Sequence, residues 1–147
     1  MSEQPTTIYV CFEPEHRLLA ERVNSWPRTN SDLDQYAARI EHDVGSPAAE
    51  TVKGELRQQI LAATVFVCVV GQTTFMDPWI DWEIRTARDK PGRGGLVAIM
   101  LDDLYPHPPG LRGAGTMFVK IKQTFVMDAV AWASEEKDPG EDYILEE

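Results

Sequence analysis

Cysteine is scarce in this sequence: the 147 residues include only Cys11 and Cys68. A small secreted domain held together by disulfides would contain more cysteine. Both cysteines lie inside apolar runs, where a thiol behaves as a small hydrophobic side chain. The first seven residues also lack the basic and then apolar pattern of a secretory signal. These features together predict a reduced, cytoplasmic domain.

Positive charge and long apolar runs are also lacking. Lysine and arginine number 14 against 24 acidic residues, which gives a formal net charge of −10 and an isoelectric point near 4.7. Proteins that bind nucleic acids concentrate basic residues on one face, so we expect no nucleic-acid partner. No apolar run approaches the roughly 20 residues that span a bilayer, so we expect no membrane partner.

Several common site motifs are absent. The sequence contains neither of the two common glycine-rich phosphate loops, G-x-x-x-x-G-K-[ST] and G-x-G-x-x-G, and it has no G-x-S-x-G nucleophile elbow. The histidines, His16, His42 and His107, do not stand at metal-ligand spacing from the cysteines. The sequence therefore predicts no metal site, and we expect no permanently bound cofactor.

Three short apolar runs are present, at residues 8–12, 65–70 and 96–101. Their residues do not alternate between apolar and polar, which is typical of strands covered on both faces. Helical patterns lie between them. Their expected starts are Pro14, the pair Ser46 and Pro47, and the pair Asp77 and Pro78. This alternation predicts an α/β fold with a mostly parallel central sheet flanked by helices.

Other segments are ambiguous. Residues 33–40 suit a short edge strand or an irregular loop, and residues 118–122 alternate weakly, as a strand would. Residues 125–132 suit a strand or a helix. The acidic end, residues 134–147, is expected to be a frayed tail.

Ligands of parallel sheets bind beyond the carboxyl ends of the strands. We therefore expect the functional residues within the segments 12–16, 71–82 and 102–105.

The expected helix that starts at Asp77 and Pro78 contains an unusual carboxylate. Asp81, Arg85 and Asp89 stand four residues apart and form an alternating-charge ladder of the kind found on solvated helix faces. Glu83 lies off this ladder, and its neighbours three and four positions away include Trp79 but no basic residue. A carboxylate of this kind is a candidate functional group. The alternative is that Glu83 bonds to a backbone group or a distant arginine.

The segment 65–87 resembles the centre of a TIR domain, and more narrowly the bacterial TIR-like group that includes the ThsB proteins of Thoeris anti-phage defence. The strand ending at Gly71, and Trp79 four residues before Glu83, match the family pattern. The loop at residues 13–16, Glu-Pro-Glu-His, departs from the family's usual serine and aspartate pattern. The resemblance implies a flavodoxin-like three-layer sandwich, with a TIR-like domain at residues 1–133 followed by the acidic tail.

The resemblance also implies a function. Many bacterial TIR domains cleave the bond between ribose and nicotinamide in NAD, and some convert the ADP-ribose into a signal. The family's catalytic glutamate would be Glu83, with NAD as substrate. Phe12, Tyr36, Thr74 and Trp79 would be substrate contacts. The alternative for Phe12 and Trp79 is ordinary core packing. The product could be hydrolysed, cyclic or conjugated ADP-ribose.

Two alternatives stay open beside an NAD-cleaving enzyme. The first is a non-catalytic TIR-like module that self-associates or acts as a scaffold, in which Glu83 would be structural. The second is another enzyme on a similar sheet, such as a nucleoside deoxyribosyltransferase-like protein. For the enzyme, the resemblance implies a downstream effector that reads a nucleotide signal.

Overall fold

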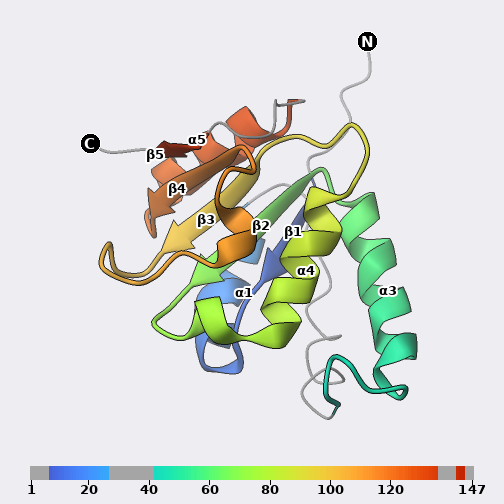
Figure 1. The fold of residues 1–147 in the computed structure, drawn as a ribbon. Helices are drawn as coiled ribbons and strands as arrows, with labels where there is room; N and C mark the ends of the chain where they lie inside the picture. Colours follow the sequence, from blue (N-terminus) through green and yellow to red (C-terminus); the bar gives the residue numbers. More distant parts are fainter. Residues whose placement is uncertain (1–6, 27–41, 136–141, 145–147) are drawn as a thin grey trace.

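A parallel sheet forms the centre of the protein in the computed structural model, which describes residues 7–26, 42–135 and 142–144. The described strands are hydrogen-bonded in the order β1-β2-β3-β4-β5, and every neighbouring pair is parallel (Figure 1). Their bounds are β1 Ile8–Cys11, β2 Val65–Val70, β3 Leu96–Met100, β4 Thr116–Lys120 and β5 Tyr143–Ile144.

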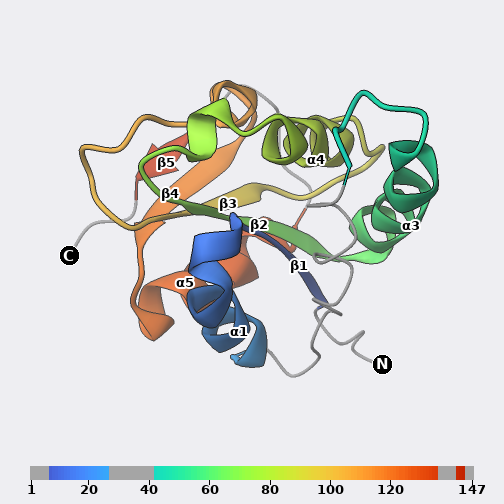
Figure 2. The same cartoon turned by 90° about the horizontal axis from the view of Figure 1, so that it is seen from below.

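Helices cover both faces of this sheet. Figure 2 shows α3 and α4 on one face and α1 and α5 on the other. The α/β class, a flavodoxin-like three-layer sandwich on a parallel sheet, is therefore confirmed. The α-helices are α1 Arg17–Ser25, α3 Ala49–Ala62, α4 Pro78–Arg88 and α5 Gln123–Ala133, and the short 3-10 helices are η1 Pro14–His16, η2 Thr74–Met76 and η3 Pro109–Leu111.

The three apolar runs form strands because both of their faces are buried. Every residue of β1, β2 and β3 is buried, as the lack of alternation predicted. Side chains alternate between two cores: Tyr9 packs toward α3 and α4, whereas Val10 packs toward α1 and α5. Cys11 and Cys68 are fully buried and are not joined by a disulfide, as expected of small hydrophobic side chains.

The predicted helices are present, with two differences. The segment expected to form one helix from Pro14 is divided into the 3-10 turn η1 and the helix α1. The helix expected from Ser46 and Pro47 begins at Ala49. In the described part of the chain, no helix is both long and apolar enough to cross a bilayer.

The ambiguous segments are partly settled. The weakly alternating strand is β4, displaced two residues toward the amino terminus from the predicted range, and residues 125–132 belong to the helix α5. Residues 143 and 144 pair with β4, so the fraying expected of the acidic end does not apply to them. Residues 33–40 lie outside the described residues.

Candidate active site

The helix α4 begins where the sequence predicted. The Asp77 side chain accepts hydrogen bonds from the backbone N–H groups of Trp79 and Ile80, at 2.9 and 3.2 Å, and Pro78 occupies the first turn. Along the exposed face of the helix, Arg85 donates to Asp81 at 2.8 Å. The charge ladder is thus on the surface, and Glu83 points away from it.

Glu83 is completely buried, with none of its surface exposed. The hydroxyl of Tyr9 in β1 donates a hydrogen bond to Oε1 of Glu83, from 74 positions earlier in the chain. The Tyr9 ring stacks on Phe66 of β2, with the ring centroids 5.6 Å apart. A carboxylate removed from water needs such donors, because burying it unpaired is very unfavourable. Glu83 therefore lies between α4 and the face of the sheet, and this bond comes from a tyrosine rather than from an arginine or the backbone.

Trp79 lies one turn before Glu83 on α4 and is partly buried. Its Nε1 donates to the backbone carbonyl of His42 at 2.8 Å, and its ring meets Trp82 edge-on with centroids 5.9 Å apart. This placement agrees with the core-packing interpretation of Trp79. The ring packs against apolar neighbours while the indole N–H finds a hydrogen-bond acceptor, as is usual for a partly buried tryptophan. The tryptophan fixes the backbone at His42 against the start of α4.

Thr74 takes part in a hydrogen-bond network at the carboxyl ends of β1 and β2. Its hydroxyl donates to Oε1 of Glu13 at 2.6 Å and accepts from the N–H of Gly71 at 2.8 Å. The Thr73 hydroxyl donates to the other oxygen of Glu13 at 3.0 Å. Glu13 is nearly buried, so the network fixes one carboxylate at the edge of the sheet where ligands of parallel sheets bind.

The sequence placed Glu13 inside an expected functional segment, residues 12–16, but did not single it out as a site residue. The signal was nevertheless present, because Glu13 follows the first apolar run and Thr73 and Thr74 follow the second. Neighbouring parallel strands bring their carboxyl ends together, so polar residues after each strand meet. What the sequence did not reveal is that β1 and β2 are neighbours in the sheet.

The structure does not bring Phe12 and Glu83 together. Phe12 is buried in the core beneath α1 and α5, on the opposite face of the sheet from Glu83 and Tyr9. This placement favours the core-packing interpretation of Phe12. Tyr36, the remaining predicted substrate contact, lies outside the described residues.

The third expected segment, residues 102–105, borders a hollow of about 510 Å³ beyond the ends of β3 and β4. Asp102, Asp103 and Lys120 are among its lining residues. The hollow is lined by neither Glu83 nor Glu13, so it is separate from both carboxylates.

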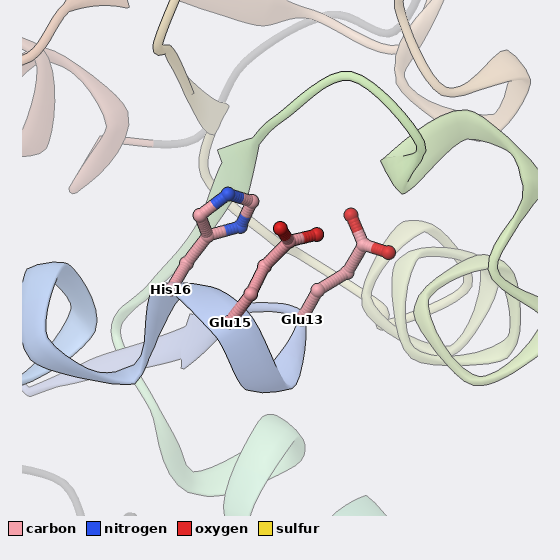
Figure 3. A group of neighbouring side chains, drawn as sticks. All are labelled: Glu13, Glu15 and His16. Atoms are coloured by element: carbon pink, nitrogen blue, oxygen red, sulfur yellow. The ribbon is translucent and has the colours of Figure 1, made fainter.

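Three side chains at the end of β1 form a group that could hold a metal ion. Glu13, Glu15 and His16 each place a potential ligand atom within 4.8 Å of the others (Figure 3). The search for metal ligands by spacing between histidine and cysteine did not find this group, because its members are neighbours on a single turn and include no cysteine.

Comparison with known protein families assigns the chain to a family. No curated protein is similar enough to the chain to count as a relative. Residues 9–105 match the family model described as Thoeris protein ThsB, TIR-like domain. The matched range contains β2, β3 and α4 and all of β1 except its first residue, together with Glu83, Trp79 and the Glu13 network. The chain therefore belongs to the ThsB TIR-like family of Thoeris proteins.

Proposed function

We propose that this chain is an NAD-consuming enzyme of anti-phage defence that cleaves the bond between ribose and nicotinamide. The observation that supports the proposal is the single carboxylate of Glu83, four residues after Trp79 within the matched family region. As nicotinamide leaves, the ADP-ribosyl group would be captured by water, by a nucleophile within the same group or by another acceptor, which gives hydrolysed, cyclic or conjugated ADP-ribose. The product would act as a nucleotide signal for a downstream effector.

The proposed chemistry needs only one carboxylate. Nicotinamide leaves as a neutral molecule from a cationic nitrogen, so no general acid is required. The ribose passes through a transition state resembling an oxocarbenium ion, as in glycoside hydrolysis. A fixed carboxylate in a site of low polarity stabilises that positive charge and can bind a ribose hydroxyl.

A substrate bound at Glu83 would have to replace the hydrogen bond that the Tyr9 hydroxyl donates to its carboxylate. Because Glu83 is fully buried, ribose can reach it only if the packing around this contact opens. The Tyr9 hydroxyl and a ribose hydroxyl are the same type of donor. A bound ribose would therefore replace one hydrogen bond to Oε1 with an equivalent one, and Glu83 would remain partnered throughout.

The test is NAD turnover, measured by chromatography and mass spectrometry in the presence of lysate from phage-infected cells. We expect nicotinamide release by the wild type and loss of that release in Glu83→Gln, in which the amide is uncharged but can still accept from Tyr9. Glu55→Gln, on the exposed face of α3, is the matched control and should retain activity. Equal turnover in wild type and Glu83→Gln would show that another residue is catalytic.

A non-catalytic interaction module is the second candidate. The observation that favours it is the complete burial of Glu83 and its bond to Tyr9, which is what a structural carboxylate would show. A module of this kind self-associates or binds a partner without turning over NAD. Two results together would favour the module over the enzyme. The wild type would show no NAD turnover, and wild type and Glu83→Gln would self-associate equally in analytical ultracentrifugation.

A further inference from the structure

Three side chains at the end of β1 lie close together. Glu13 precedes the short helix η1, and Glu15 and His16 lie within it. Figure 3 shows the two carboxylates and the imidazole projecting side by side from this turn. One ligand atom from each lies within 4.8 Å of the other two.

The imidazole of His16 contains a polar atom that nothing described in the structure satisfies. Its Nδ1 is buried and has no hydrogen-bond partner among the described residues. In Figure 3 this edge of the ring faces the Glu15 carboxylate. A buried polar atom without a partner is unfavourable, and a bound cation would satisfy it.

Glu13 is held in place as a ligand would be. Two hydroxyl groups, from Thr73 and Thr74, donate to its two oxygens at 3.0 and 2.6 Å, and the N–H of Gly71 orients Thr74 in turn. Each carboxylate oxygen keeps a further lone pair, so these bonds leave capacity for a metal. Outer partners of this type orient the ligands of protein metal sites.

Gly71 makes room for the histidine ring. A Cβ atom at this position would lie 2.3 Å from Cε1 and 2.8 Å from Nε2 of His16. Any larger residue would therefore push the ring out of its place. The glycine at the end of β2 thus determines where the imidazole lies relative to Glu13 and Glu15.

The chemistry of the group selects the type of cation. One imidazole and two carboxylates suit the borderline divalent ions of the first transition series, whereas Mg²⁺ and Ca²⁺ prefer oxygen ligands alone. Ligand atoms around a tetrahedral Zn²⁺ lie about 3.3 Å apart, given metal–ligand distances of about 2.0 to 2.2 Å. Because the side chain of Glu15 is exposed, it can rotate to close the remaining gap.

We propose that Glu13, Glu15 and His16 form a binding site for a divalent transition-metal cation, with Zn²⁺ as the probe of choice. The three protein ligands leave a position open for water or for an oxygen of a ligand. The proposal does not depend on NAD cleavage, because it concerns binding of the metal alone. It departs from the expectation, drawn from histidine and cysteine spacing, that the chain has no metal site.

The test is calorimetric titration of the tag-free full chain with Zn²⁺, in the absence of NAD. We expect one Zn²⁺ per chain and affinity reduced at least about tenfold in Glu15→Gln and in His16→Gln. Gly71→Ala should weaken binding as well, although it removes no ligand. Glu55→Gln and His42→Gln are the matched controls and should bind as the wild type does.

Titration with Co²⁺ gives an independent readout. We expect visible d–d absorption without a thiolate-to-metal charge-transfer band, because the site contains no cysteine. Absence of saturable binding by the wild type would overturn the proposal, and so would full affinity in either Glu15→Gln or His16→Gln. A charge-transfer band would also overturn it, since it would assign the metal to Cys11 or Cys68.

Discussion

At the scale of single residues, Thr73 and Thr74 offer a direct comparison. Both hydroxyls donate to Glu13, but Thr74 is buried and also accepts from the Gly71 N–H, whereas Thr73 is exposed. We expect Thr74→Val to lower the free energy of unfolding by about 2 kcal/mol and Thr73→Val by about 0.5 kcal/mol. Urea denaturation followed by circular dichroism would measure both. Equal losses would show that burial of the Thr74 network contributes nothing.

His107 predicts how stability depends on pH. Burial lowers its pKa from the ordinary value of 6.5, the nearby Arg112 lowers it further, and Asp142 partly opposes the shift. The imidazole stacks on Phe118 with ring centroids 4.0 Å apart. Because the folded protein binds fewer protons here than the unfolded chain, this contribution is fully present above pH 6.5 and is lost as the pH falls below it.

The measurement is the free energy of unfolding between about pH 7 and about pH 5.5, a range in which histidine titrates. We expect a steeper fall for the wild type than for His107→Phe, which keeps the stack on Phe118 but cannot be protonated. His16 and His42 are present in both proteins and cancel in the difference. Identical pH dependence in the two proteins would contradict the role of His107.

At the scale of elements, the start of α4 depends on Asp77. Its carboxylate accepts from two backbone N–H groups of the first turn, whereas Asp81 forms only an exposed ion pair with Arg85. We expect Asp77→Ala to cost about 1 kcal/mol of stability, and Asp81→Ala to cost about 0.3 to 0.5 kcal/mol. Since α4 also contains Trp79 and Glu83, loss of the cap should reduce any NAD turnover more than Asp81→Ala does. Thermal denaturation of the two variants and the wild type would check the ranking.

The elements were predictable where local sequence determines them. The runs that became β1, β2 and β3 are apolar on both faces, and Asp77 with Pro78 marks the start of α4 unambiguously. The prediction of one helix from Pro14 was less accurate, because its first turn adopts the 3-10 geometry of η1. Residues 125–132 could not be assigned to strand or helix from an apolar pattern that suits either, and packing beneath the sheet decided in favour of α5.

The candidate site was predictable only in part, because its contacts join distant segments. The sequence singled out Glu83 by its lack of a basic neighbour, but the bond to Tyr9 spans 74 positions. The contact between Glu13 and Thr74 spans 61 positions and depends on β1 lying beside β2. Periodicity along one helix carries no information about either pairing.

At the scale of the whole molecule, the two cores separate Phe12 from Glu83, two of the predicted site residues. Tyr9 and Glu83 lie in the layer of α3 and α4, and Phe12 lies in the layer of α1 and α5. Neighbouring positions of a strand point to opposite faces, so residues that are close in sequence belong to different cores. An NAD site built on Glu83 would therefore draw on α4 and the loops after β1 and β2, without Phe12.

The last described residues add a short strand to the sheet. Asp142 accepts from the N–H groups of Gly113 and Thr116 at 2.7 and 2.9 Å, and the two residues that follow pair with β4. The ring of Tyr143 also meets Trp132 of α5 edge-on, at a centroid distance of 5.2 Å. The last described segment thus joins β4 to α5 and covers an edge of the sheet.

Removing β5 should expose β4 as an edge strand. We expect truncation after residue 141 to lower stability and to promote association, because unpaired strand edges template pairing with other chains. Asp142→Ala should lower stability by about 1 kcal/mol through its lost hydrogen bonds while leaving the pairing residues in place. Thermal denaturation with light scattering would separate the two effects. If the truncated protein stayed as stable and as monodisperse as the wild type, β5 would contribute nothing to protecting the edge of β4.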